Sequence, residues 1–274
     1  PMYCLPNNVV EQLAREFRQL YPNAKLLVLT NDDLPAVPKA TKTVKTEDGR
    51  KKKVKNEALD KLPAEEKAKI IEKRAARLRT LARIKTEDWD GIIISHNMFE
   101  RFPLTPETTA AFIQEQVDTL ERTVKEAKGE HMSKRSISGM ETRIANLKEK
   151  LKDILDTDLD DIGIPFEQLG IDQLFVDEAD MFKNLYYTTS MDRVSGLAQS
   201  NANRSNDMFA KTQWLTRAMG GRGVVFATGT PISNTMAEMY TMLRYLDMQG
   251  LKEKKLDMFD NWIRTFAEVG SGME

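Results

Sequence analysis

The sequence predicts an α/β protein, with a parallel sheet flanked by helices and interrupted by an antiparallel helical hairpin. Short apolar runs end abruptly in polar residues, most clearly at residues 173–176 and 224–227. Such runs are typical of parallel strands that are buried on both faces and open onto a ligand crevice at their carboxyl ends. Between the runs, apolar residues recur at the spacing of helices, and two long helical patterns occupy residues 106–156.

Composition limits the class of protein without revealing its function. The 274 residues suffice for one large domain or two small ones. The net charge of -1 gives no overall preference for nucleic acid, so a basic face requires local segregation of charge. The single cysteine, Cys4, excludes an internal disulfide framework and fits a reducing compartment. No apolar run reaches about 18 residues and no secretory leader is present, so we expect a cytoplasmic protein without a membrane partner.

The first third of the chain alternates strands and helices. Residues 2–5 and 26–30 read as strands, and the spacing of apolar residues between them predicts an amphipathic helix over 9–21. A helix over 64–84 then precedes a third buried strand within 89–96. This alternation predicts parallel strands with right-handed crossover connections.

A basic segment interrupts this alternation between Pro35 and Asn56. It carries eight lysines and arginines around Asp48-Gly49, at positions 39, 42, 45, 50, 51, 52, 53 and 55. Two interpretations remain open, a solvated mobile loop or a short hairpin that reaches for phosphates. We refer to residues 38–56 as the basic loop.

Two helical seams predict the hairpin. Four apolar residues recur at 4-3-4 spacing in the first seam, Ile113, Val117, Leu120 and Val124. The second seam has 3-4-3 spacing and comprises Ile144, Leu147, Leu151 and Ile154. We therefore predict antiparallel helices at about 106–127 and 137–156 that bury their seams against each other. Two interpretations of the hairpin remain open. It is a structural insert or interaction arm in the first, and an arm that grips DNA in the second.

Two polar motifs follow the strands at 173–176 and 224–227. Asp177 and Glu178 suit a magnesium nucleotide, because one carboxylate can hold the hydrated metal while the other polarises the attacking water. The alternative role for these carboxylates is to cap a helix. The stretch from Thr228 to Pro231 adds two hydroxyls, and Gly229 would let the backbone approach the acidic strand closely, unless this is an ordinary turn. His96 and His131 lie far apart in the sequence and predict no zinc site.

These two motifs resemble motifs II and III of superfamily-two helicases. The continuation Asp180-Met181-Phe182-Lys183-Asn184 and the form Thr-Gly-Thr-Pro-Ile-Ser-Asn are similar to Swi/Snf-type DNA translocases. Large mobile-element proteins that join such a motor to an adenine methylase look similar around 89–99 and 166–184. The resemblance implies a RecA-like first motor lobe of the P-loop nucleotidase class, in which residues 2–5 begin motif Ia and Ser95 belongs to motif Ib.

The resemblance also implies roles for particular residues. Asp177 would hold Mg²⁺ through water, and Glu178 would orient or deprotonate the attacking water. The residues that would couple the nucleotide to DNA grip are Ala179, Asp180, Thr228, Gly229, Thr230 and Pro231. The residues that would contact DNA are Pro6, Asn7, Asn8, Ser95, His96, Lys183 and Asn184.

A phosphate-binding loop of the form Gly-x-x-x-x-Gly-Lys-[Ser/Thr] does not occur in the sequence. We therefore expect an incomplete lobe, divided as 1–105, 106–160 and 161–274, from a longer prokaryotic or phage-borne protein. The longer protein would supply the phosphate-binding loop and a second motor lobe. It would use ATP and Mg²⁺ and would act on duplex DNA. The fragment alone would be inactive. One alternative is a non-catalytic scaffold that binds DNA or protein; another is an RNA helicase, from which Ala227-Thr228-Gly229 departs.

Overall fold

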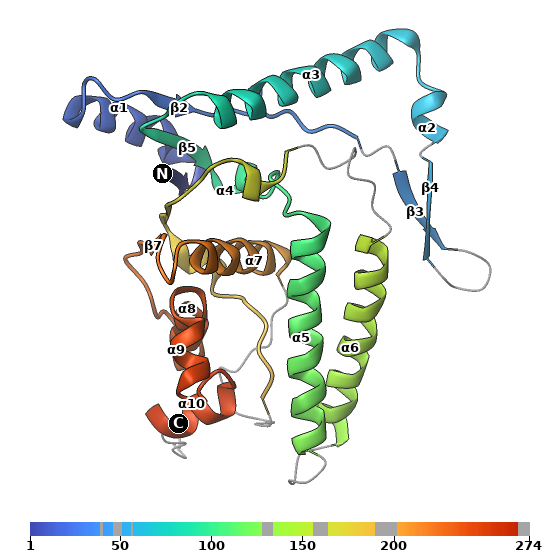
Figure 1. The fold of residues 1–274 in the computed structure, drawn as a ribbon, viewed down its shortest axis with the longest axis vertical. Helices are drawn as coiled ribbons and strands as arrows, with labels where there is room; N and C mark the ends of the chain where they lie inside the picture. Colours follow the sequence, from blue (N-terminus) through green and yellow to red (C-terminus); the bar gives the residue numbers. More distant parts are fainter. Residues whose placement is uncertain are drawn as a thin grey trace. The chain divides into compact units, whose positions relative to one another are not determined.

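The computed structural model describes residues 1–38, 41–45, 51–55, 57–127, 134–155, 164–189 and 202–267. The chain divides into two compact units. The first comprises residues 1–106 and 152–171, and the second comprises residues 107–151 and 172–274. Parallel strands flanked by helices occur in both units, which confirms the predicted α/β class (Figure 1). The three-part division at 105/106 and 160/161 stays a prediction.

The first unit contains three parallel strands in the order β2 (Leu26–Val28), β5 (Gly91–Ser95) and β1 (Met2–Leu5). All five residues of β5 are buried, as expected of a central strand between two partners. Helix α1 (Val10–Leu20) covers this sheet with Val10 and Ala14. The parallel register pairs Leu5 with Ser95, so the residues that follow both strands lie at the same edge.

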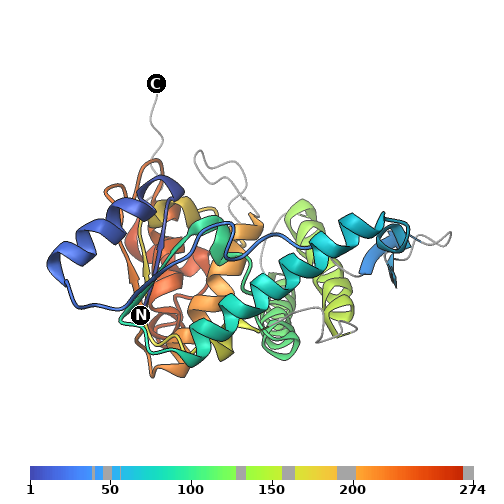
Figure 2. The same ribbon diagram turned by 90° about the horizontal axis from the view of Figure 1, so that it is seen from above.

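The remaining parts of the first unit extend from this sheet. The basic loop contains an antiparallel hairpin of β3 (Thr41–Lys45) and β4 (Lys51–Lys55), whereas its contact with phosphates stays a prediction. Helix α3 (Ala64–Thr86) begins beside α2 (Glu57–Asp60) and this hairpin, as Figure 2 shows. Leu78 is 52% exposed although it is apolar, because α3 packs mainly through its last turns, where Leu81 and Ile84 are buried. The short helices are η1 (Asn7–Val9), α4 (His96–Phe99) and η3 (Phe166–Gln168).

The predicted helical hairpin is present in the second unit as α5 (Pro106–Ala127) and α6 (Lys134–Leu155), which lie side by side in Figure 1. Leu120, Val124 and Met140 are buried between them, with Ile144 and Leu147 at the margin. Lys148 donates to Glu121 over 2.6 Å across the pair. The helical hairpin is therefore confirmed, with two residues of each predicted seam in the shared cluster, and α6 begins three residues before the predicted 137. The segment 128–133, which joins the helices, lies outside the described residues.

The hairpin also packs against the rest of its unit. The rings of Phe112 and Phe209 meet edge to face with centroids 5.5 Å apart. Glu115 forms ion pairs with Arg217, whose guanidinium lies 2.6 Å from Glu115 Oε2, and with Lys252. Burial alone would raise the pKa of the Glu115 carboxyl. The hydrogen bonds and charges of Lys252 and Arg217 have a larger combined effect, so the pKa is lowered. Helix α5 is thus an integral part of the second unit.

The second unit contains two parallel strands, β6 (Leu174–Val176) and β7 (Val224–Phe226). The prediction that both are buried on both faces holds in part for β6, where Leu174 and Val176 are buried and Phe175 is partly buried. It is wrong for β7, where Val225 is 47% exposed. Among the described residues of this unit, β7 pairs with β6 alone, so its second edge is open. Gly223 precedes β7 with φ +99°, and a Cβ there would lie 2.8 Å from the carbonyl oxygen of Asp172, so glycine is required.

Helices cover the remainder of the second unit, beginning with α7 (Asn203–Ala218). They continue with α8 (Met236–Leu246), α9 (Met248–Glu253) and α10 (Phe259–Phe266). An aromatic core of Tyr187, Tyr240, Phe259 and Trp262 joins α8 to α10. None of the helices in the described ranges combines the length and hydrophobicity of a membrane span.

Candidate nucleotide site

The carboxyl ends of β6 and β7 bring the two predicted motifs together. The parallel register pairs Val176 with Phe226. Beyond the strands, the N–H of Ala227 donates to the carbonyl of Val176 at 2.8 Å. The N–H of Ala179 donates in turn to the carbonyl of Ala227 at 3.0 Å. Backbone hydrogen bonds therefore continue from the sheet into both motifs and fix their relative position.

A side-chain hydrogen bond joins the motifs directly. The Thr228 hydroxyl donates to Asp180 Oδ1 at 3.0 Å, and the same oxygen of Thr228 accepts the N–H of Thr230 at 3.1 Å. Asp180 itself lies in η4 (Ala179–Phe182), the short helix that follows the acidic pair. The structure thus brings together residues that the sequence assigned to coupling, although their role in coupling stays a prediction.

Glu178 has an unusual backbone conformation at the end of β6. Its φ of 48° and ψ of 49° lie in the left-handed region, which non-glycine residues rarely adopt. The side chain is exposed. Partial desolvation, followed by the charges of Asp180 and Asp177, raises the pKa of the Glu178 carboxyl. A raised pKa makes a carboxylate a better proton acceptor, which suits the predicted role beside an attacking water.

The acidic pair suits Mg²⁺ that arrives with a nucleotide. Asp177 is partly buried and Glu178 exposed at the same strand end, and carboxylate oxygens are ligands that Mg²⁺ prefers. Within the described ranges, no group of three or more histidine, cysteine or carboxylate side chains forms a metal cage. Magnesium sites of nucleotide-binding proteins commonly use one or two carboxylates and take the other ligands from water and phosphate. The residues present therefore fit this kind of site.

The expectation that glycine at 229 permits a close approach of the backbone to the acidic strand is wrong, while its role in coupling stays a prediction. A Cβ at this position would meet no atom within 4 Å, and the residue has no positive φ. The loop approaches the acidic strand through the backbone of Ala227 and the hydroxyl of Thr228 instead. Close approach consequently does not demand glycine at 229.

Lys183 and Glu238 form the most heavily bonded part of this region. Lys183 Nζ lies 3.2 Å from Glu238 Oε1 and also donates to the Ser233 hydroxyl. Glu238 Oε2 accepts the N–H of Ser233 at 2.7 Å and that of Asn234 at 3.2 Å. Burial raises the pKa of Glu238, but these backbone donors and Lys183 outweigh it and lower the pKa to about 2. The ion pair connects the segment after motif II to the loop of motif III.

Helix α8 also holds the segment after the acidic motif through three side chains on one face. The Thr241 hydroxyl lies 3.1 Å from the carbonyl of Lys183, and the Tyr245 hydroxyl lies 3.0 Å from that of Phe182. Arg244 donates to the carbonyl of Tyr186 at 2.7 Å. Spacings of three and four place these side chains on the same side of the helix. Movement of residues 182–186 would therefore be transmitted to α8.

The predicted DNA contacts fall in two places. In the first unit, Asn7 and Asn8 are exposed and lie at the same sheet edge as Ser95 and His96. Ser95 and His96 are each only 3% exposed, so their side chains are not presented to a phosphate. In the second unit, the Lys183 ammonium is engaged by Glu238. Pro6 is partly exposed and Asn184 is exposed. Contact with DNA stays a prediction for all seven residues.

Sequence reasoning missed Glu238. A signal was present, because Thr235-Met236-Ala237-Glu238 has the spacing of a capping box, in which the glutamate turns back toward the start of its helix. In the structure the carboxylate reaches further, to the N–H groups of Ser233 and Asn234, which precede the N-cap residue Thr235. The local pattern therefore indicates that the Glu238 side chain points back toward the start of α8. Its pairing with Lys183 depends on the tertiary structure.

Comparison with known proteins gives a family match. Residues 60–274 match the family model described as "Probable helicase domain". A segment of 83 residues is 34% identical to the Defense against restriction protein B of Escherichia phage P1. This segment is 30% of the present chain and 4% of the phage protein, so the chain spans a small part of that relative. No solved structure matches the chain.

Proposed function

The chain belongs to the probable helicase domain family, and from this premise we propose that it is part of an ATP-dependent DNA translocase motor of the Swi/Snf type. The observation that carries the proposal is the hydrogen bond between Thr228 and Asp180 beside the acidic pair. It joins the two motifs at the carboxyl ends of adjacent parallel strands, where α/β proteins bind their ligands. The family itself shows that the chain contains a helicase-related domain.

Each acidic residue has a distinct role in this proposal. Asp177 holds the water-coordinated metal of the Mg·ATP substrate, while Glu178 orients the attacking water and accepts its proton at the carboxylate. The exposed position and raised pKa of Glu178 support that role. When bound, Mg²⁺ neutralises charge on the phosphates. Phosphoryl transfer to water needs positioning and charge stabilisation more than covalent help, and fixed strand ends provide positioning.

Coupling to DNA runs through the bonded loops in this proposal. Asp180 and Thr228 connect motif II to motif III, and the Lys183–Glu238 pair connects the following segments. A change at Asp177 or Glu178 on hydrolysis would therefore shift the loop at 228–234 and α8 together. The exposed side chains of Asn7 and Asn8 offer polar contacts to phosphates without reading bases.

The open edge of β7 supports the proposal that this lobe is incomplete. Apolar strands of parallel sheets are normally paired and covered, whereas Val225 is 47% exposed. We propose that a strand outside the present sequence pairs with β7 and carries the phosphate-binding loop. A second motor lobe would complete the ATP site. The phage relative supports a phage or mobile-element setting for the full protein.

The experiment is DNA-stimulated ATP hydrolysis by the full-length parent protein, with Glu178→Gln as the test variant. We expect ATP binding to persist and hydrolysis to fall by about 100-fold or more, because the substitution keeps the shape and removes the base. Glu72→Gln, an exposed residue of α3, is the matched control and should be unchanged. A parent protein that binds DNA but shows no hydrolysis before any substitution would instead favour the non-catalytic scaffold.

A further inference from the structure

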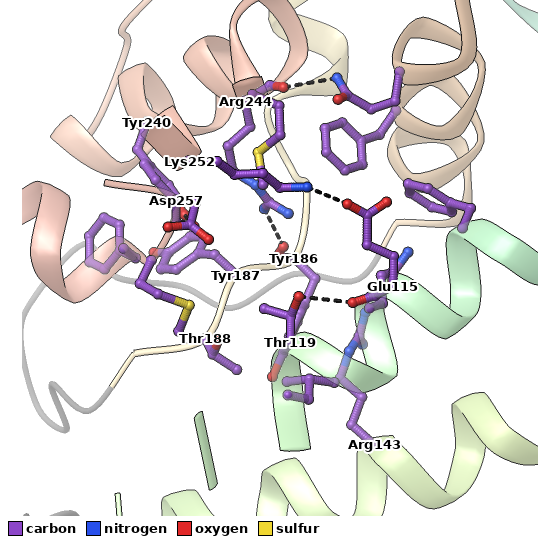
Figure 3. Close-up of a pocket in the computed structure, with 18 of the residues that line it drawn as sticks. Glu115, Thr119, Arg143, Tyr186, Tyr187, Thr188, Tyr240, Arg244, Lys252 and Asp257 are labelled. Carbon is purple, nitrogen blue, oxygen red and sulfur yellow. Dashed lines mark hydrogen bonds and ion pairs between the residues drawn. The ribbon is translucent and has the colours of Figure 1, made fainter. Parts of the chain in front are cut away.

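A pocket in the second unit lies apart from the two nucleotide motifs. It has a volume of about 90 Å³ and is lined by residues of α5, α6, α7, α8, α9 and the segment 186–188. Figure 3 shows Glu115, Arg143, Tyr187, Tyr240 and Lys252 among them. Because roughly 10–15 Å³ in this measure holds one water molecule, the space accommodates a group the size of a single ring with its polar substituent. None of the residues assigned to the nucleotide or to DNA lines it.

Aromatic rings form the walls of this pocket. Tyr187 packs against Phe259 with ring centroids 4.5 Å apart and against Tyr240 at 6.0 Å. Phe112 and Phe209 contribute from α5 and α7. Flat apolar walls of this kind favour a flat apolar ligand, since aromatic pairs gain energy beyond the burial of area.

Basic side chains outnumber acidic ones around the pocket. The lining has four basic residues, Arg143, Arg217, Arg244 and Lys252, and two acidic ones, Glu115 and Asp257. Glu115 is engaged by two of the four bases, Arg217 and Lys252. The Arg143 guanidinium lies 3.5 Å from the centre of the Tyr186 ring. Asp257 is on the side of Tyr240, whose hydroxyl donates to the Asp257 carbonyl. An anion is therefore favoured near Arg244 rather than near Asp257.

Two of the buried polar groups of the lining matter for a ligand, because no hydrogen-bond partner for them lies among the described residues. The Tyr187 hydroxyl is one, on a residue that is only 6% exposed, and Arg244 Nε is the other. Arg244 is held in place by its bond to the Tyr186 carbonyl and by the faces of Phe209 and Tyr240, at 4.9 and 5.7 Å. A buried donor without a partner is costly, and an N–H next to a positive charge prefers a charged acceptor.

From the size, the aromatic walls and these two donors, we propose that the pocket binds a one-ring aromatic carboxylate. The ring lies among the aromatic side chains, and the carboxylate accepts hydrogen bonds from Arg244 Nε and the Tyr187 hydroxyl. This activity is separate from the proposed use of ATP and DNA and does not depend on it.

The test is ligand-detected NMR titration of the 274-residue chain with benzoate, benzyl alcohol and AMP as probes. We expect benzoate to bind with a Kd below about 1 mM, and benzyl alcohol, which keeps the ring and loses the charge, to bind at least about tenfold more weakly. AMP is expected to bind more weakly than benzoate because of its size. Absence of benzoate binding, equal binding of benzyl alcohol, or preferential binding of AMP would each overturn the proposal.

Two conservative variants and one matched control locate the site. Tyr187→Phe keeps the ring and Arg244→Lys keeps the charge, and each removes one donor, so each should weaken benzoate binding by about tenfold. Tyr240→Phe lines the same pocket but loses a hydroxyl already bound to Asp257, so affinity should be unchanged. Tyr187→Phe removes an unsatisfied buried group and should not lower the melting temperature. Unchanged benzoate affinity in both donor variants would contradict the assigned position.

Discussion

Replacing Glu238 with glutamine tests how strongly the loop of motif III is held. The carboxylate accepts two backbone N–H groups and pairs with Lys183, and a neutral amide loses the charge on which these bonds depend. A pKa of about 2, compared with the ordinary 4.5, sets an upper limit of about 3 kcal/mol on its contribution to stability. Solvent at the edge of the site screens the charges, so we expect about 1–2 kcal/mol.

The assay is urea unfolding of wild type and Glu238→Gln, followed by tryptophan fluorescence, at several values of pH. The folded-state pKa is lowered, so the stabilisation is present above the unfolded value of 4.5 and is lost as pH falls toward 2. The difference between wild type and variant should therefore be full at pH 7 and clearly smaller at pH 3.5. Glu72→Gln, on the exposed face of α3, serves as the control. A difference that is absent at pH 7, or that does not change down to pH 3.5, would refute the reasoning.

Three further predictions concern the two motifs and the sheet. A double-mutant cycle of Asp180→Asn and Thr228→Val should give a coupling energy of about 0.5–2 kcal/mol in unfolding experiments, because the two side chains are hydrogen-bonded; additive effects would show that the bond is not formed in solution. Val225→Lys should change the stability of the present chain by less than about 0.5 kcal/mol and should destabilise the full-length parent by about 2 kcal/mol or more, if a further strand covers β7; equal effects in both proteins would contradict that strand. In the metal-free chain, the Glu178 carboxyl should titrate above its ordinary value in a pH series followed by NMR, because desolvation and the charges of Asp180 and Asp177 raise its pKa; titration at or below the ordinary value would contradict this environment.

Much of the fold was predictable from local patterns. The continuous apolar run at 91–95 predicts a buried strand, and the repeated apolar residues of the hairpin predict two helices that pack on each other. The structure confirms both elements. The bounds of α8 also follow a local pattern, because apolar residues repeat along it between a turn and a polar residue, Asp247. Burial was less predictable. Leu78 and Val225 fit apolar patterns but are exposed, since nothing in the described part of their units covers them.

The site was predictable in its parts and not in its connections. The sequence indicated the acidic pair and the Thr-Gly-Thr-Pro loop, and the parallel sheet brings them together as expected. The left-handed backbone of Glu178 is a local strain that its sequence does not indicate. The pairing of Lys183 with Glu238 depends on a contact between segments about 50 residues apart. The aromatic pocket draws on α5, α7, α8 and α9, and no local pattern indicates which faces of these helices meet.

The measurement that tests the central claim most directly is displacement of a triplex-forming oligonucleotide from duplex DNA by the full-length parent protein. A motor that moves along duplex DNA displaces the third strand only while it hydrolyses ATP, whereas a binding scaffold does not. The account predicts ATP-dependent displacement by the wild type and by Glu72→Gln, and loss of displacement in Glu178→Gln with DNA binding retained. Displacement without ATP, or undiminished displacement by Glu178→Gln, would contradict the account.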